Sequence, residues 1–250
     1  MKLLANQVVF VTGATGGIGQ AICSVLAENG ASVVIGYNQS KKKAEKILEQ
    51  LAEVPAGHLI CPAVVTDSQS LKDAALSVKS KFGKCDILIN CAGVTKFVEH
   101  QDLESLDDDL IDLILTTNIR GVIASIRAFL PLLQQSEKGL ILNISSIAAR
   151  TAMGSNIAYC ASKAAVDNLT VSLARALAPK IRVISIAPGL SDTEFVQGLD
   201  QEWRDQQAEL TPLGRLALPE EVASAVLASA AHLTFTTGTV IPVDGGRPIY

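Results

Sequence analysis

Aromatic side chains are scarce in this chain, at 4% of its 250 residues, whereas hydrophobic residues as a whole make up 48%. A core of this composition must be filled mainly by aliphatic side chains, which is typical of a parallel sheet covered by helices on both faces. Charged residues contribute only 18%. A chain this apolar can bury a large core, which excludes a disordered protein.

An excess of positive charge is also missing, because 21 lysines and arginines face 25 aspartates and glutamates and the net charge is −4. A protein that binds nucleic acid carries a basic face, and the short run Lys41–Lys43 does not make one. No apolar run approaches the roughly 18 residues of a membrane span, and polar residues interrupt the N-terminal segment at once, unlike a signal peptide. We therefore expect a cytoplasmic protein with neither a nucleic-acid nor a membrane partner.

The sequence lacks paired cysteines and metal-ligand patterns. Its five cysteines are an odd number without a Cys-x-x-Cys pair, and its three histidines have no ligand spacing. We expect free, mostly buried thiols in a reducing compartment, with no disulfide and no bound metal. The cysteines are Cys23, Cys61, Cys85, Cys91 and Cys160.

What the chain does contain is an alternation of short β-branched segments with segments of helical periodicity. This alternation predicts right-handed crossovers and an α/β fold, a Rossmann-type doubly wound parallel sheet of about seven strands. No linker divides residues 1–250, so we expect a single domain. The predicted strands are 8–12, 32–35, 59–65, 87–90, 140–144, 183–186 and 239–243, and the predicted helices are 17–29, 40–52, 68–82, 106–133 with a break near Pro131, 157–178 and 220–231.

The first predicted strand runs into a glycine-rich turn, TGATGGIG at residues 12–19. Missing side chains let a pyrophosphate approach the N-terminus of the next helix, where free N–H groups and the helix dipole favour an anion. Such a turn is weak evidence alone, since a tight strand–helix connection needs glycine without any ligand. Its position between the first strand and the first helix favours a dinucleotide.

The end of the second predicted strand bears on the choice between NAD and NADP. An NAD site usually places an acidic residue about 20 residues after the turn, on the ribose hydroxyls. The segment IGYNQSK at residues 35–41 has no carboxylate to repel a 2′-phosphate. Asn38, Ser40 and Lys41 are suitable donors for that phosphate, so we favour NADP(H) over NAD(H). The alternative is that the lysines only solvate a helix start, which we expect for Lys42 and Lys43.

Tyr159 and Lys163 lie four residues apart in the segment YCASK. Positions i and i+4 share one face of a helix. An ammonium beside a phenol favours the phenolate, so the hydroxyl becomes able to exchange a proton near neutral pH. Next to a nucleotide-binding turn, this pair suggests hydride chemistry on an alcohol or a carbonyl. The alternative is that Tyr159 is only a half-buried aromatic residue that packs on its helix.

From residue 12 to residue 246 the chain resembles the short-chain dehydrogenases/reductases, with the family's landmarks in order. A lone Tyr-x-x-x-Lys pair carries little information, whereas the ordered set is specific. Cys91 departs from the pattern, since it replaces the second asparagine of Asn-Asn-Ala-Gly. Besides Asn38, Ser40 and Lys41, the resemblance implies cofactor contacts at Gly13, Thr15, Gly17, Ile18, Gly19, Asp67, Asn90, Ala92, Gly93, Tyr159, Lys163, Pro188, Gly189 and Thr193.

The same resemblance implies a catalytic set. Tyr159 would give a proton to the carbonyl oxygen during reduction and remove it during oxidation, while Lys163 would lower the Tyr159 pKa and bind the nicotinamide ribose. Ser146 would orient the substrate oxygen, because its distance to Tyr159 along the chain is that of the family, and Ser145 would be structural. Asn118 would help to hold a water that links Lys163 to a proton path.

In overall pattern the chain resembles 3-oxoacyl-[acyl-carrier-protein] reductases and bacterial sugar or secondary-alcohol dehydrogenases, so a small carbonyl or alcohol substrate is implied. The segment 191–213 follows the sixth strand, where ligands bind in such sheets, and is expected to be a lid. The helix 157–178 is apolar around most of its circumference. It therefore predicts a homo-oligomer, a tetramer, packed through this helix and the long one before it. Two rivals stay open: a catalytically silent nucleotide-binding sensor or scaffold, and a dehydratase or epimerase of the same fold.

Overall fold

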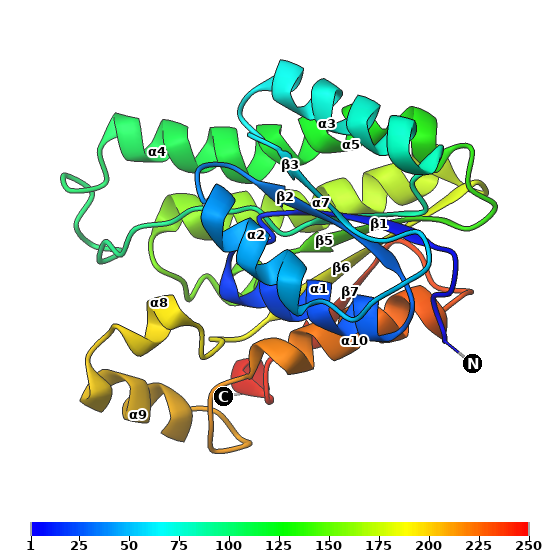
Figure 1. The fold of residues 1–250 in the computed structure, drawn as a ribbon. Helices are drawn as coiled ribbons and strands as arrows, with labels where there is room; N and C mark the ends of the chain where they lie inside the picture. The colour runs from blue at the N-terminus through cyan, green and yellow to red at the C-terminus, as the bar shows by residue number, and fades with distance from the viewer. Residues whose placement is uncertain (1, 250) are drawn as a thin grey trace.

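Seven parallel strands form one sheet in the order β3-β2-β1-β4-β5-β6-β7. The structure is a computed structural model and describes residues 2–249, so Met1 and Tyr250 of the expected domain lie outside the described residues. Helices cover both faces of the sheet (Figure 1), which confirms the predicted Rossmann-type doubly wound fold. The strands are β1 (Val8–Thr12), β2 (Ser32–Tyr37), β3 (Leu59–Pro62), β4 (Ile87–Asn90), β5 (Gly139–Ile144), β6 (Ile181–Pro188) and β7 (Thr239–Val243).

The two faces of the sheet have separate aliphatic cores. Successive side chains of a strand point to opposite faces, so Val9 and Val11 of β1 pack against α1, α2 and α10, whereas Val8 and Phe10 pack against α3, α5 and α7. Strands covered on both sides read as continuous apolar runs. The helices are α1 (Gly17–Glu28), α2 (Lys41–Gln50), α3 (Ser68–Phe82), α4 (Asp108–Leu115), η1 (Thr116–Arg120), α5 (Gly121–Leu133), α6 (Ala148–Thr151), α7 (Ile157–Leu177), α8 (Glu194–Gln197), α9 (Gln201–Glu209), α10 (Pro219–Ala231) and η2 (Arg247–Ile249).

The long helical stretch before β5 differs from the prediction. It does not break near Pro131, which lies inside the last turns of α5, where the buried Phe129, Leu132 and Leu133 anchor the helix against the sheet. The irregularity falls earlier, at η1, a π-helical turn that contains Asn118. A π turn of this kind is frequent at functional sites because it displaces one residue from the regular ladder.

The same stretch, residues 108–133, is long and apolar enough to cross a membrane by length and composition alone. This differs from the expectation that no segment approaches a membrane span, because the whole helix is longer than any uninterrupted apolar run. Half of its most apolar window is buried inside the fold. That burial is what the core helix of a globular protein shows.

The segment after β6 contains two short helices, α8 and α9. The sequence predicted neither helix, because apolar and charged residues alternate there without a helical period. Both project beyond the carboxyl end of the sheet, on the side where α4 begins (Figure 1). An ion pair of 2.7 Å between Arg204 and Asp192 ties α9 to the start of the segment. Ser191 also forms a parallel bridge with Ala217, so both ends of the segment are attached to each other.

Candidate active site

A cavity of about 1080 Å³ lies along the carboxyl ends of the strands, from the glycine-rich turn to α9. Ligands of doubly wound sheets bind at this edge. Most of the residues expected from the sequence share its wall, although they come from many segments. They are Gly13, Thr15, Gly17, Ile18, Gly19, Asn38, Ala92, Gly93, Ser146, Tyr159, Lys163, Pro188, Gly189 and Thr193.

The glycine-rich turn is pressed against the loop that follows β4. Gly13 has a φ of +63°, and a Cβ on it would lie 2.6 Å from the Cα of Ala92, so only glycine fits. The Thr12 hydroxyl oxygen accepts hydrogen bonds from the backbone N–H groups of Cys91 (3.1 Å) and Ala92 (3.2 Å). The turn is thus a backbone-lined cradle at the start of α1, and its shape and free N–H groups suit a pyrophosphate.

At the β2 end of the cavity the lysines are placed differently from the expectation. Lys41 is largely exposed and lies 3.7 Å from Glu45, and neither it nor Ser40 lines the cavity. Lys43 does line the cavity, although the sequence predicted that it only solvates the helix start. It differs from Lys41 because side chains two residues apart on a helix point to different faces. Its ammonium donates a 2.7 Å hydrogen bond to Glu194 of α8, which lowers the pKa of that carboxyl.

Asp67 and Asn90 also lie outside the cavity lining. Asp67 caps α3, since its carboxylate accepts a hydrogen bond of 2.8 Å from the Gln69 N–H, and it follows Thr66, which does line the cavity. Asn90 is buried at the end of β4, where its amide donates to the Asn143 side chain at 2.9 Å. Asp67 therefore fixes the start of α3, and Asn90 joins the ends of β4 and β5.

Tyr159 and Lys163 project from the first turns of α7 into the cavity, as their spacing predicts. The Lys163 ammonium lies 5.6 Å from the centre of the Tyr159 ring and donates a 2.9 Å hydrogen bond to the Ile144 carbonyl. Ser146 is half-buried at the end of β5. Ser145 is buried, and its hydroxyl donates at 3.4 Å to the backbone carbonyl of Lys163, so it fastens the strand to the helix.

Asn118 stands behind the cavity wall. Its carbonyl oxygen accepts from the Val94 N–H at 2.9 Å, and its NH₂ group donates to the Val94 carbonyl and to the Ser162 hydroxyl, both at 3.0 Å. A Cβ on Gly93 would lie 3.4 Å from the Asn118 oxygen and 3.6 Å from the Lys163 ammonium. The π turn thus brings Asn118 against the loop that separates it from Lys163.

Asn156 is a site residue that the sequence analysis missed. Its side-chain oxygen caps α7 by accepting from the Tyr159 N–H at 2.7 Å, and its amide donates to the Lys96 carbonyl at 2.8 Å and to the Thr95 hydroxyl at 3.3 Å. It is only 1% exposed. An asparagine just before the first helical residue is the ordinary signal of a helix N-cap, and this signal would have identified Asn156, three residues before Tyr159.

Cys91 lies in the cavity wall, but its chemistry is that of a packed thiol. Burial raises its pKa to about 11, and the nearby Lys163 ammonium offsets only part of that rise. The thiol is therefore protonated at neutral pH and a poor nucleophile. Burial also raises the pKa of the Cys160 thiol, so packing explains both residues.

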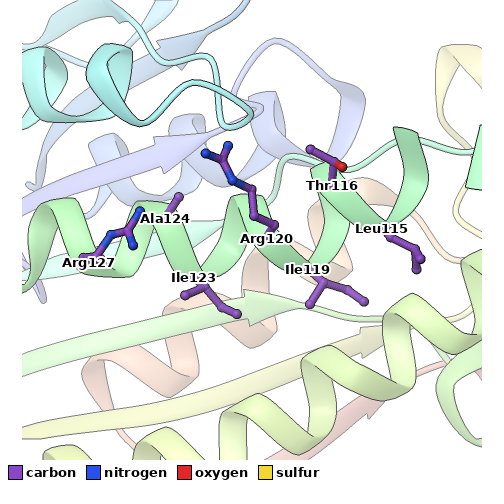
Figure 2. Close-up of a pocket in the computed structure, with 7 residues that line it drawn as sticks. All are labelled: Leu115, Thr116, Ile119, Arg120, Ile123, Ala124 and Arg127. Carbon is purple, nitrogen blue, oxygen red and sulfur yellow. The ribbon is translucent and has the colours of Figure 1, made fainter. Parts of the chain in front are cut away.

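A second hollow, of about 490 Å³, lies on the outer face of the long helix (Figure 2). Arg120 and Arg127 project there from positions two helical turns apart, and both donate hydrogen bonds to the Ser68 hydroxyl, at 3.1 and 3.3 Å. None of the expected site residues lines it. The larger cavity is therefore the candidate active site.

A parallel sheet of this strand order, with a glycine-rich turn after its first strand, is the architecture of a dinucleotide-binding protein. The family model described as enoyl-(acyl carrier protein) reductase matches residues 13–247. The chain belongs to the short-chain dehydrogenase/reductase family and is an NAD(P)-dependent oxidoreductase.

Three similar proteins cover almost the whole chain. The 3-oxoacyl-[acyl-carrier-protein] reductase FabG of Thermotoga maritima is 32% identical over 250 residues, which are 98% of this chain and 99% of that protein. Its counterpart in Staphylococcus aureus is 34% identical over 249 residues, 98% of this chain and 99% of the other. The solved structure of a short-chain dehydrogenase/reductase from Serratia marcescens has 33% identity and a TM-score of 0.89, with 98% of both chains covered.

Replacement of Asn156 tests whether its amide positions Tyr159. We expect Asn156→Ala to lower the free energy of unfolding by about 1 kcal/mol through loss of the cap, and also to lower kcat, since both α7 and the loop at Thr95 lose their common anchor. Denaturant unfolding and steady-state kinetics measure the two effects. Asp107→Ala, which removes the cap of α4, is the matched control and should cost stability only. Equal kcat values for the two variants would show that Asn156 is merely structural.

Proposed function

We propose that this enzyme transfers hydride between NADP(H) and a small carbonyl or secondary alcohol, with Tyr159 as the acid/base group. One observation carries the proposal. Ser146, Tyr159 and Lys163 share one cavity wall with the glycine-rich turn, although more than 120 residues separate them from that turn in the sequence. The bound nicotinamide supplies the hydride chemistry, and the protein supplies position and proton exchange.

Each catalytic side chain has a role that its contacts support. Tyr159 gives its proton to the carbonyl oxygen in reduction, and the Lys163 ammonium, fixed by the Ile144 carbonyl, stabilises the negative charge left behind. Ser146 hydrogen-bonds the substrate oxygen. The side chain of Asn118 is already engaged with Val94 and Ser162, so we assign it the positioning of these two groups rather than direct contact with a water.

The cofactor contacts follow the cavity from β2 to β6. We propose that the turn 13–19 binds the pyrophosphate, that the loop 90–93 lies along the nucleotide, and that Pro188, Gly189 and Thr193 border the nicotinamide. Asp67 is assigned to the adenine, next to Thr66. At the ribose, Asn38 and Lys43 line the cavity and are the donors best placed for a 2′-phosphate, whereas Ser40 and Lys41 stand further out.

We further propose that the segment 191–213 is a lid and that residues 2–249 form one domain around the cavity. Val196, Leu199 and Trp203 of the segment line the cavity, so its movement would open or close the substrate end. The silent-sensor alternative has no observation in its favour. We also propose a cytoplasmic location, which the five free cysteines support because a reducing compartment keeps thiols unpaired.

We also propose a homo-oligomer, a tetramer, packed through α7 and the long helical stretch formed by α4, η1 and α5. Large apolar side chains are exposed on both elements, among them Leu113 (51%) and Ile123 (43%) on the preceding helix and Ile157 (42%) and Val171 (37%) on α7. Figure 2 shows Ile123 in line with Ile119 and Leu115 along one face. A second copy of this chain would remove that stripe from water.

Deletion of the Tyr159 hydroxyl tests the acid/base assignment. With simple ketones and NADPH, we expect Tyr159→Phe to lower kcat by about a hundredfold or more, because general acid–base catalysis contributes that much, while NADPH affinity stays within a few-fold. Tyr37→Phe, in the buried core, is the matched control. Unchanged turnover in Tyr159→Phe would exclude the assignment. A wild-type protein that binds NADPH but turns over no carbonyl or alcohol would favour the silent sensor.

Charge removal at Lys43 tests the cofactor preference. We expect Lys43→Ala to weaken NADPH binding by about tenfold, since a hydrogen bond to a charged group is worth about 1.5–3 kcal/mol, and to leave NADH binding nearly unchanged. Glu194→Gln frees Lys43 and should strengthen NADPH binding, whereas Lys41→Ala should change little. Titration by nucleotide fluorescence measures the NADPH and NADH affinities of the wild type and of the three variants. A tenfold preference of the wild type for NADH would contradict the NADP assignment.

A charge placed on the exposed stripe tests the oligomer. We expect Ile123→Asp to convert the protein to a smaller species, because burying an unpaired carboxylate at an interface is costly. Light scattering after size-exclusion chromatography gives the mass. Leu76→Asp, at a position on α3 that is more exposed than Ile123 (62% against 43%), should keep the wild-type mass. A monomeric wild type, or a full-size Ile123→Asp assembly, would rule out packing through this face.

A further inference from the structure

Arg247 lies at the opposite end of the cavity from the proposed 2′-phosphate site. It follows β7, the last strand of the sheet, and its side chain lines the cavity. The end of β7 is joined to the proposed nicotinamide segment by a 2.9 Å hydrogen bond from the Gly189 N–H to the Val243 carbonyl. Along the edge of the sheet, Arg247 therefore comes after the nicotinamide strands, on the side where only substrate remains to be bound.

The Arg247 guanidinium is held in a fixed direction by a neutral partner. It donates to the backbone carbonyl of Gln207 at 3.2 Å and to the Gln207 side-chain oxygen at 2.9 Å, from α9 of the lid segment. Both residues line the cavity. A guanidinium has five N–H donors, so these two contacts leave three for another acceptor.

In the part of the chain that the structure describes, Arg247 takes part in no ion pair. Within residues 2–249, the ion pairs join Lys41 to Glu45, Lys43 to Glu194, Lys84 to Asp86, Arg204 to Asp192 and Arg215 to Glu221. The arginine of the lid segment, Arg204, is thus paired with Asp192, whereas Arg247, which follows β7, has no such partner among these pairs. A half-buried cation that forms no ion pair with residues 2–249 favours an anionic ligand where it lines a cavity.

We propose that Arg247 binds an anionic group of the substrate, so that the preferred substrates are carbonyls or secondary alcohols that also carry a carboxylate or a phosphate. This inference rests on the proposed function, because it assigns the substrate of the same cavity. The planar fork of the guanidinium matches either anion with two parallel hydrogen bonds. Leu199 and Trp203, which also line this end, provide an apolar wall for the chain between the carbonyl and the anion.

The test compares oxoalkanoates of graded chain length with their methyl esters, which differ only in the charge. For the wild type we expect kcat/KM with NADPH to be about tenfold or more higher for the best acid than for its ester, the size of a charge-assisted hydrogen bond. Arg247→Met should abolish that ratio, and Arg247→Lys should restore part of it as a point charge. Oxoalkyl phosphates in place of the carboxylates show which of the two anions is preferred.

Arg204→Met is the matched control, because it loosens the lid without removing a cavity charge and should preserve the acid-to-ester ratio. A wild-type ratio near one, or equal losses for acid and ester in Arg247→Met, would overturn the proposal and leave Arg247 as a tie between the lid and the C-terminal turn. Calorimetric binding of acid and ester to the NADP⁺-saturated protein gives the same comparison without turnover. If the protein binds the acid through Arg247 but reduces no carbonyl, the anion site stands and the proposed hydride transfer in this cavity is refuted.

Discussion

Helix α7 is fastened to its surroundings by the side-chain amides of three buried asparagines. Asn156 caps the helix and bonds the loop at residues 95–96, Asn118 reaches Ser162, and Asn143 donates to Thr170 at 2.9 Å. An amide can donate and accept at once, so each one joins two segments without bringing a charge into the core. The positions of Tyr159 and Lys163 relative to the sheet depend on these contacts, because a helix that rotates or slides would take both side chains out of the cavity.

The charges on the cavity wall are arranged in the order of the ligands that they suit. Lys43 lies at the β2 end, Lys163 in the middle beside Tyr159, and Arg247 beyond β6. Lys43 is paired with the Glu194 carboxylate of α8, and the Lys163 ammonium donates to the Ile144 carbonyl. Each side chain is therefore held in place without a ligand. Preorganised charge of this kind costs little reorganisation during a reaction. An elongated dinucleotide followed by an anionic substrate matches the sequence of positive groups from one end to the other.

Local sequence patterns were sufficient for the seven strands, most of the long helices and the candidate chemistry, although not for α8, α9 or the π turn. The turn at residues 12–19 and the Tyr159–Lys163 spacing are short-range features, and α3, β4 and β7 have the boundaries that periodicity predicts. Pro131 misled the prediction because a proline's local cost is outweighed by buried neighbours that only the folded helix brings into contact with the sheet. Lys41 was preferred to Lys43 because linear distance from β2 does not show which face of α2 borders the cavity.

The sequence by itself determined the alternating α/β architecture, the glycine-rich turn after the first strand and the Tyr159–Lys163 pair on one helix face, since each depends on residues within one helical turn or one strand–helix connection. Tertiary structure alone decided that Lys43 lines the cavity and Lys41 does not, that Asn156 and Asn118 bond α7 to neighbouring segments, and that Arg247 enters the cavity more than 80 residues after Tyr159. Such contacts join segments whose separation along the chain carries no information about their distance in space. They exist only because the carboxyl ends of all seven parallel strands meet at one edge.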